Sequence, residues 1–129
     1  MASKKPVCVL AVEFDRSFSS ALMSFLHRDG YTVRIARSSG AALALAAAGD
    51  CDLVISEIPL PDGTAASLMR TLKSQYGLKG IALCNGLPAD DMAAAKAAGF
   101  DRIVPKPLNI NLLKLAIEEL MESAPPPAQ

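Results

Sequence analysis

The sequence predicts an α/β protein with a doubly wound, five-stranded parallel sheet flanked by five helices. Short apolar runs alternate with helical stretches along the chain, which is the pattern of a repeated βα unit. Four of the helical stretches end at glycines, namely Gly30, Gly49, Gly77 and Gly99. Each glycine stands where a left-handed C-terminal cap is expected, and a strand-like run follows it. Parallel strands joined in this way need helices on both faces of the sheet.

The five predicted strands are short and rich in apolar residues. They are VCVLAV (7–12), TVRIA (32–36), LVIS (53–56), GIAL (80–83) and RIV (102–104). The first and third are unbroken apolar runs, whereas the second and fifth each carry an arginine. We therefore expect the first and third strands at the centre of the sheet and the second and fifth at its edges. A strand order of 2-1-3-4-5 fits this assignment.

The helices are predicted from apolar residues at helical spacing. The segments are 18–26 with Phe18, Leu22, Phe25 and Leu26; the Ala-rich 41–48; a helix that carries Leu68 and Leu72; 88–98; and a last helix with Leu112, Leu113, Ala116, Ile117 and Leu120 on one face. Asn109 is the predicted N-cap of the last helix. The tail APPPAQ cannot continue that helix. We divide the chain into an N-terminal extension (1–6), one folded domain (7–122) and a Pro-rich tail or linker (123–129).

Length and composition exclude several classes of function. A chain of 129 residues, 51% of them apolar, is large enough for one core and too small for two. The 13 basic residues equal the 13 acidic ones, so no net charge favours nucleic acid or a membrane surface. No stretch reaches the roughly 18 apolar residues of a membrane span. We expect a cytoplasmic protein.

The cysteines do not form a metal-binding pattern. Cys8, Cys51 and Cys84 show no CxxC spacing, and His27 is the one histidine of the chain. Reduced and mostly buried thiols are the expectation.

A sheet of order 2-1-3-4-5 places its functional crevice beyond the carboxyl ends of the first and third strands, where the winding reverses. The residues that follow the strands should meet there. They are Glu13, Phe14 and Asp15 after the first strand, Glu57 after the third, Cys84, Asn85 and Gly86 after the fourth, and Lys106 and Pro107 after the fifth. No glycine-rich loop follows the first strand, which argues against the common nucleotide and flavin sites.

Each of these residues also has a purely structural interpretation. Asp15 fits the N-cap of the first helix, and Glu13 and Glu57 could be solvated charges at the rim. Lys106 could be a surface lysine, although the Lys-Pro pair indicates a rigid turn that aims the side chain inward. Cys84 is most simply a small buried hydrophobe.

Four segments carry a resemblance to a known family. VEFD (12–15), DLVISEIPLPDG (52–63), IALCNG (81–86) and AAGFDRIVPKP (97–107) resemble the receiver domain of bacterial response regulators, over about residues 7–120. The resemblance implies a flavodoxin-like, CheY-like fold. In that family an aspartate at the end of the third strand accepts a phosphoryl group from a histidine kinase, and two acids after the first strand hold Mg²⁺. A Ser or Thr and a Lys bind the phosphoryl oxygens, and an aromatic residue in the fifth strand reports the change.

At most of these positions the chain departs from the family pattern. The residues at the matching positions are Glu57 for the phosphoacceptor, Glu13 and Phe14 for the acidic pair, Cys84 for the hydroxyl, Ile103 for the aromatic switch, and Lys106 with Pro107 for the lysine. Only the lysine stands as the family has it.

The substitutions predict a degenerate pseudo-receiver rather than an enzyme. Mg²⁺ requires oxygen ligands, and Phe14 offers none, so metal binding should be weak or absent. The carboxylate of Glu57 lies one methylene beyond that of an aspartate, and misplacement by about 1 Å can cost on the order of a hundredfold in rate. A lasting contact between Glu57 and Lys106 would partly imitate the phosphorylated state.

The predicted function is a phosphorylation-independent protein-binding module in two-component signalling. One alternative is a working phosphorelay receiver that uses Asp62 or Asp15 as acceptor. Another is a thiol sensor at Cys84, with Lys106 nearby. The resemblance implies a histidine kinase or an output domain as partner, bound through the fourth helix, fifth strand and fifth helix, whereas no nucleic acid or membrane is expected. Homodimerisation stays open.

Overall fold

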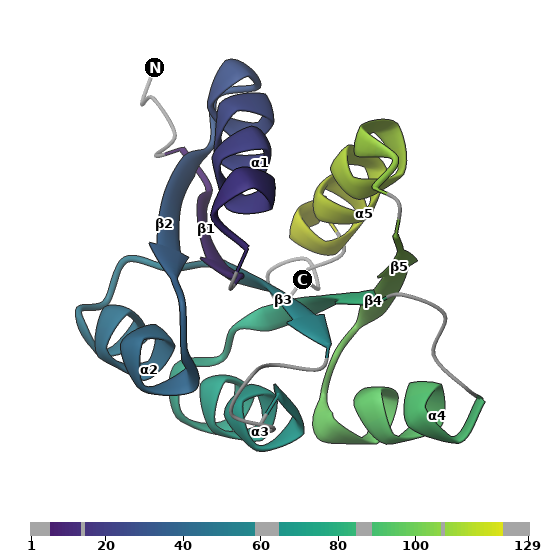
Figure 1. Cartoon of the computed structure of the whole chain (residues 1–129). Helices are drawn as coiled ribbons and strands as arrows, with labels where there is room; N and C mark the ends of the chain where they lie inside the picture. The colour runs from purple at the N-terminus through teal and green to yellow at the C-terminus, as the bar shows by residue number, and fades with distance from the viewer. Residues whose placement is uncertain (1–5, 14, 59–64, 85–88, 107, 123–129) are drawn as a thin grey trace, which may run out of the picture.

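A computed structural model describes residues 6–13, 15–58, 65–84, 89–106 and 108–122, although for 89–91 only the backbone. Strands and helices alternate strictly along these residues (Figure 1). The elements are β1 (Cys8–Val12), α1 (Arg16–Arg28), β2 (Thr32–Ala36), α2 (Ser39–Ala47), β3 (Leu53–Ile58), α3 (Ala65–Tyr76), β4 (Lys79–Cys84), α4 (Ala89–Ala98), β5 (Arg102–Pro105) and α5 (Ile110–Glu122). No helix within these ranges is long and apolar enough to cross a membrane.

The strands form one parallel sheet in the order β2-β1-β3-β4-β5, as predicted. Helices α1 and α5 cover one face, and α2, α3 and α4 cover the other (Figure 1). The central position of β1 and β3 follows from their composition, since a strand covered on both faces needs apolar side chains on both. The arginines of β2 and β5, Arg34 and Arg102, lie on edge strands.

Each face of the sheet has its own core, because successive side chains of a strand point to opposite faces. On one face Val9 and Ala11 of β1 pack in a cluster with Leu22 and Leu26 of α1. Leu10, on the opposite face, belongs to a second cluster with residues of α2, α3 and α4. The sheet is therefore rigid, and it holds the residues at its carboxyl edge in fixed positions.

The predicted helix ends are confirmed. Asp15 caps α1, with its Oδ1 accepting a hydrogen bond from the N–H of Phe18 at 3.1 Å. Asn109 caps α5 by accepting bonds from two backbone N–H groups of the first turn. The four glycines predicted to follow helices all have positive φ, between 67° and 116°. A side chain at these positions would be strained, which explains why glycine ends the helices.

Three strands, β3, β4 and β5, are longer than predicted, and in β3 and β4 this changes where the site residues lie. β3 continues through Glu57 to Ile58, and β4 continues through Cys84. Glu57 pairs with Leu83 and Ile58 with Cys84 in the parallel ladder. The prediction that Glu57 and Cys84 follow their strands is therefore wrong by one or two residues, because ladder pairing continues past the apolar run that the sequence shows.

Candidate functional site

Three charged side chains from separate segments meet at the carboxyl edge of the sheet. Nζ of Lys106 lies 3.5 Å from Oε2 of Glu57 and 3.7 Å from Oε2 of Glu13. Glu13 directly follows β1, Glu57 lies in β3 and Lys106 directly follows β5. The crevice prediction thus holds for these three residues, and one ammonium group faces two carboxyl groups.

Glu13 is buried rather than solvated at the rim. Its side chain is 1% exposed, so the interpretation as a rim charge is wrong for this residue. Oε1 accepts a hydrogen bond from the N–H of Asp15 at 3.2 Å. Oε2 is buried and accepts no geometrically sound hydrogen bond among the described residues, and the ammonium of Lys106 lies 3.7 Å from it. Burial of a charged carboxylate with so few polar partners is unfavourable in free energy.

The surroundings of Glu13 raise its pKa from the ordinary value of 4.5 to about 7. Burial is the largest cause, because removal from water disfavours the charged form. The hydrogen bond from the backbone of Asp15 lowers the pKa, the hydrogen bond and negative charge of Glu57 raise it, and Lys106 lowers it again. Burial therefore favours the protonated form of Glu13 at a higher pH than for an ordinary glutamate.

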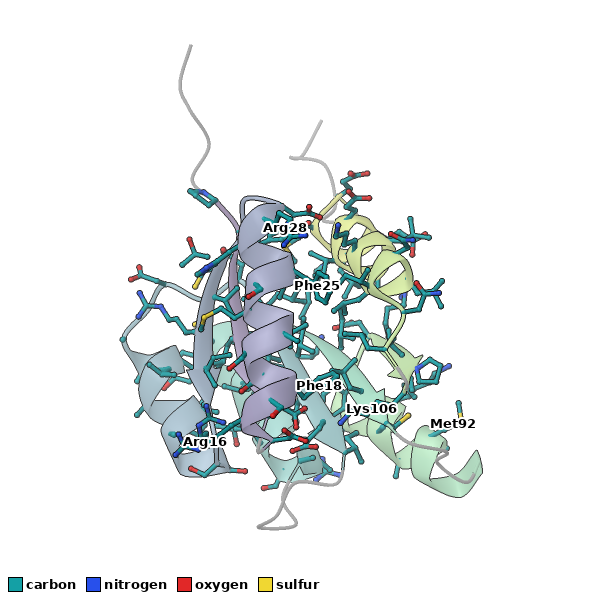
Figure 2. The ribbon with its side chains drawn as sticks, turned by 45° about the horizontal axis from the view of Figure 1, so that its top comes forward. Arg16, Phe18, Phe25, Arg28, Met92 and Lys106 are labelled. Atoms are coloured by element: carbon teal, nitrogen blue, oxygen red, sulfur yellow. The ribbon has the colours of Figure 1, made fainter. Side chains whose placement is uncertain are left out.

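The position of Lys106 is determined by its backbone and by an aromatic ring. Its N–H donates to the carbonyl oxygen of Cys84 at 2.7 Å, which extends the pairing of β5 with β4. The ammonium lies 4.5 Å from the centre of the Phe18 ring, a cation–π distance. Figure 2 shows the two side chains near each other at the start of α1. With 22% of its side chain exposed, Lys106 points to the carboxyl groups and is not an ordinary surface lysine.

Phe18 is the site residue that sequence reasoning did not find. It was assigned only to the apolar face of the first helix. It stands three residues after the cap Asp15, in the turn of α1 nearest to the crevice. An aromatic residue in that turn is the signal that could have indicated a contact with the lysine.

The other predicted site residues take structural roles. Asp15 is exposed and its carboxylate caps α1, so two acids rather than three converge on the lysine. Cys84 is buried at the end of β4, as expected for a small hydrophobe. Ile103 is partly buried and packs on the core cluster beneath α2, α3 and α4.

Five candidate site residues named in the sequence analysis lie outside the described residues, namely Phe14, Asp62, Asn85, Gly86 and Pro107. Within the described ranges no group of three or more His, Cys, Asp or Glu residues could hold a metal ion. The ammonium of Lys106 already lies within 3.5–3.7 Å of the two carboxyl groups that a cation would need, and the raised pKa of Glu13 favours its protonated form. The described residues therefore do not fit a magnesium ion.

Comparisons with known proteins agree with the observed fold. The family model of the response regulator receiver domain matches residues 9–118. The chain is 27% identical over 121 residues to a probable transcriptional regulatory protein, TcrX, of Mycobacterium tuberculosis, covering 93% of this chain and 52% of that protein. It is 32% identical over 106 residues to the KDP operon transcriptional regulatory protein KdpE of Escherichia coli, covering 82% of this chain and 47% of the other. The chain thus spans about half the length of these relatives.

Solved structures show the same fold. A two-component response regulator from Clostridium difficile superposes with a TM-score of 0.86 at 20% identity, covering 91% of this chain and 97% of that one. A CheY-like receiver domain protein from Methanospirillum hungatei gives a TM-score of 0.82 at 28% identity, covering 92% and 96%.

Proposed function

Because this chain belongs to the response regulator receiver family of two-component signalling, we propose that it is a pseudo-receiver that binds a partner protein without a phosphorylation cycle. The observation that carries the proposal is the contact between Nζ of Lys106 and Oε2 of Glu57 at 3.5 Å. In the family the matching lysine binds the phosphoryl group. Here it is engaged by a carboxylate that belongs to the protein itself.

The position of Glu57 argues against its use as a phosphoacceptor. Phosphoryl transfer depends on in-line placement of the nucleophile and on neutralisation of the phosphoryl oxygens. The carboxylate of Glu57 stands one methylene farther from the backbone than that of an aspartate. One of its oxygens already faces the ammonium that would have to neutralise the phosphoryl charge.

The state of Glu13 argues against the metal that the reaction requires. A divalent cation would have to displace the proton that Glu13 holds near pH 7 and move the ammonium of Lys106 away. Mg²⁺ also keeps strict octahedral geometry at about 2.0–2.1 Å from oxygen ligands. A carboxyl group that is buried beside a lysine is poorly placed to act as a ligand in such a coordination shell.

The pair of Glu57 and Lys106 would imitate the phosphorylated arrangement only in part. A carboxylate carries about one negative charge, against roughly 1.5–2 for a phosphoryl group. Ile103 lacks the hydroxyl and ring of an aromatic switch residue, and the buried thiol of Cys84 is a weak hydrogen-bond donor. The module would therefore rest in one state, and control would come from its concentration or from its partner.

The partner would bind the surface formed by α4, β5 and α5. Leu112 and Leu115 of α5 are each 49% exposed, and Met92 of α4 is also exposed (Figure 2). A groove of about 190 Å³ runs between β5 and α5 and is lined by Ile103, Leu112 and Leu115, among others. Exposed apolar side chains that gather around a groove are typical of protein interaction sites. A histidine kinase, an output domain or a second copy of the chain fits this surface.

The proposal is tested by incubating the protein with acetyl phosphate and Mg²⁺ and measuring its intact mass. We expect no stable phosphoryl adduct, whereas a receiver with an ordinary aspartate, treated in parallel, should gain one. An adduct that disappears in Glu57→Ala would overturn the proposal. An adduct that persists in Glu57→Ala and maps to Asp62 or Asp15 would instead support a working phosphorelay receiver.

A further inference from the structure

A second cluster of reactive side chains lies at the amino ends of the strands, at the edge of the sheet opposite Lys106. Cys8 opens β1, and Cys51 stands two residues before β3. Arg34 of the neighbouring strand β2 lines the same hollow as the two cysteines. Both cysteines are free thiols, with Cys8 5% exposed and Cys51 partly buried. The proposed function does not use this cluster.

The backbone places the segment that carries Cys51 beside Cys8. The N–H of Asp52 donates to the carbonyl oxygen of Cys8 at 2.9 Å, and the N–H of Cys8 donates to Oδ2 of Asp52 at 2.8 Å. These two bonds fix the residue next to Cys51 directly beside Cys8. Neighbouring strands lie about 4.8 Å apart, and a disulfide needs Cα atoms roughly 4.4–6.8 Å apart.

Both thiols border the same space, since they line one hollow at this end of the sheet. Burial, then the charge of Cys8 and a side-chain hydrogen bond with Cys8, raise the pKa of Cys51 from 9.0 to about 11. Cys51 packs on the core cluster that contains Leu10, which lies two residues after Cys8 on the same face of β1.

We propose that Cys8 and Cys51 form a reversible intramolecular disulfide with a low-molecular-weight disulfide as oxidant. The Cys51 thiolate attacks one sulfur of the reagent, breaks its S–S bond and releases one reagent thiolate. The Cys8 thiolate then attacks the Cys51 sulfur, closes the protein disulfide and releases the second reagent thiolate. The two protein thiols lose two electrons, the reagent is reduced to two thiols, and the two protons end on these.

Access favours Cys51 as the first residue to react. An open hollow of about 710 Å³ lies at this end of the sheet, and its lining includes both cysteines, Arg34, Asp50 and Asp52. Cys51 is the more exposed of the two thiols. The reagent therefore reacts with Cys51 first. The buried Cys8 then attacks the mixed disulfide that has formed on Cys51.

Arg34 acts as a positioning residue for this exchange. Its pKa is raised, first by a side-chain hydrogen bond with Cys8 and then by the charge of Cys8. Arg34 lowers the pKa of Cys51, whereas Asp52 raises it, and both effects are smaller than that of burial. The ion pair with Asp50 at 3.3 Å holds the guanidinium in place. A fixed positive charge stabilises the thiolates that attack and leave.

The disulfide would give the module a redox input that is separate from the Lys106 site. It would tie the start of β1 to the segment before β3, and these two strands lead to Glu13 and Glu57 at the other edge. Disulfides in reducing compartments are usually transient and sense redox conditions. The inference does not depend on the proposed function, since it holds whether or not Glu57 is phosphorylated.

The test is to incubate the full chain with oxidised glutathione and to count free thiols after denaturation. We expect loss of two of the three thiols, a mass decrease of two hydrogen atoms, and a linked peptide that contains Cys8 and Cys51. The rate should rise about tenfold per pH unit and keep rising through pH 9, where an ordinary exposed thiol levels off. The oxidised protein should melt at a higher temperature than the reduced one.

The controls use the protein's own cysteines and its arginine. Cys84→Ala removes the third thiol, far from the cluster, and should leave the linkage unchanged, whereas Cys51→Ala should abolish it. Arg34→Ala should slow closure several-fold at a given pH, with recovery in Arg34→Lys. A stable glutathione adduct on Cys51, a covalent dimer, an unchanged thiol count, or a linkage through Cys84 would overturn the proposal.

Discussion

Nζ of Lys106 and Oε2 of Glu57 lie 3.5 Å apart, although 49 residues separate them along the chain. They come from β3 and from the residue after β5, with β4 between these strands. Their contact exists because parallel strands end at the same edge of a sheet. It joins two segments that are remote in sequence, so its strength is the first quantity to measure.

Replacement of Lys106 by Met should destabilise the protein by about 1–3 kcal/mol at pH 7, because it leaves Glu13 and Glu57 facing each other without a cation. The cost should fall below that of a fully buried pair, since Lys106 and Glu57 are 22% and 16% exposed. Urea unfolding measures this free energy. A double-mutant cycle with Glu57→Gln should give a coupling above about 0.5 kcal/mol, and strictly additive effects would contradict the ion pair.

The free energy of unfolding should depend on pH through Glu13. Its pKa of about 7 in the folded protein lies above the ordinary 4.5, so between these values the folded state binds more protons than the unfolded one. Stability from this residue is therefore complete below about pH 4.5 and is lost as the pH rises to about 7. The loss should be roughly 1–3 kcal/mol.

Urea unfolding of the protein and of Glu13→Gln between pH 4.5 and 8 isolates this effect. Glutamine resembles the protonated carboxyl group and does not titrate, so the difference between the two curves belongs to Glu13. The variant should gain stability relative to the native protein as the pH rises. A difference that stays constant with pH would mean that Glu13 keeps an ordinary pKa.

The cap of α1 should contribute measurably to stability. Asp15→Ala removes the carboxylate that accepts from the N–H of Phe18 and should cost about 1 kcal/mol. Asn109→Ala, which removes the cap of α5, should cost a similar amount. Thermal or urea unfolding measures both. If Asp15 also served as a phosphoacceptor, Asp15→Ala would abolish an acetyl phosphate adduct, an outcome that the pseudo-receiver excludes.

Replacement of Gly80 and of Gly40 by alanine should change the stability of the protein in opposite directions. A Cβ at Gly80 would collide with Sδ of Met69 and lie 3.2 Å from the ring of Phe100. Gly80→Ala should therefore destabilise the protein by about 1–3 kcal/mol. A Cβ at Gly40 meets nothing within 4 Å, and this residue lies in α2. Gly40→Ala should stabilise the helix by up to about 1 kcal/mol, and equal effects at both sites would contradict the packing.

Local signals along the chain were enough to predict most of the fold. The glycines after the helices, the caps at Asp15 and Asn109 and the apolar runs all depend on neighbouring residues only. The strand order followed from the arginines of the edge strands. Helix and strand boundaries were less exact, because the ladder between β3 and β4 depends on partners far apart in sequence.

The sequence predicted which charged residues meet at the site, but not their burial or their protonation. The sequence placed Glu13, Glu57 and Lys106 in one crevice, yet both glutamates were open to interpretation as solvated charges. The burial of Glu13, its shared environment with Glu57 and the ring of Phe18 over the lysine depend on how the helices cover the sheet. The same holds for the placement of Cys8 and Cys51 at one hollow, which no spacing rule indicates.

The sequence by itself determined the alternation of strands and helices and the parallel sheet, because these follow from short-range patterns and residue chemistry. Only the tertiary structure decided which carboxyl group is buried, which side chain the ammonium of Lys106 meets and which thiols face each other. Charge states and contacts depend on removal from water and on distances of a few ångströms between remote segments. Those quantities arise only when the sheet and its helices pack together.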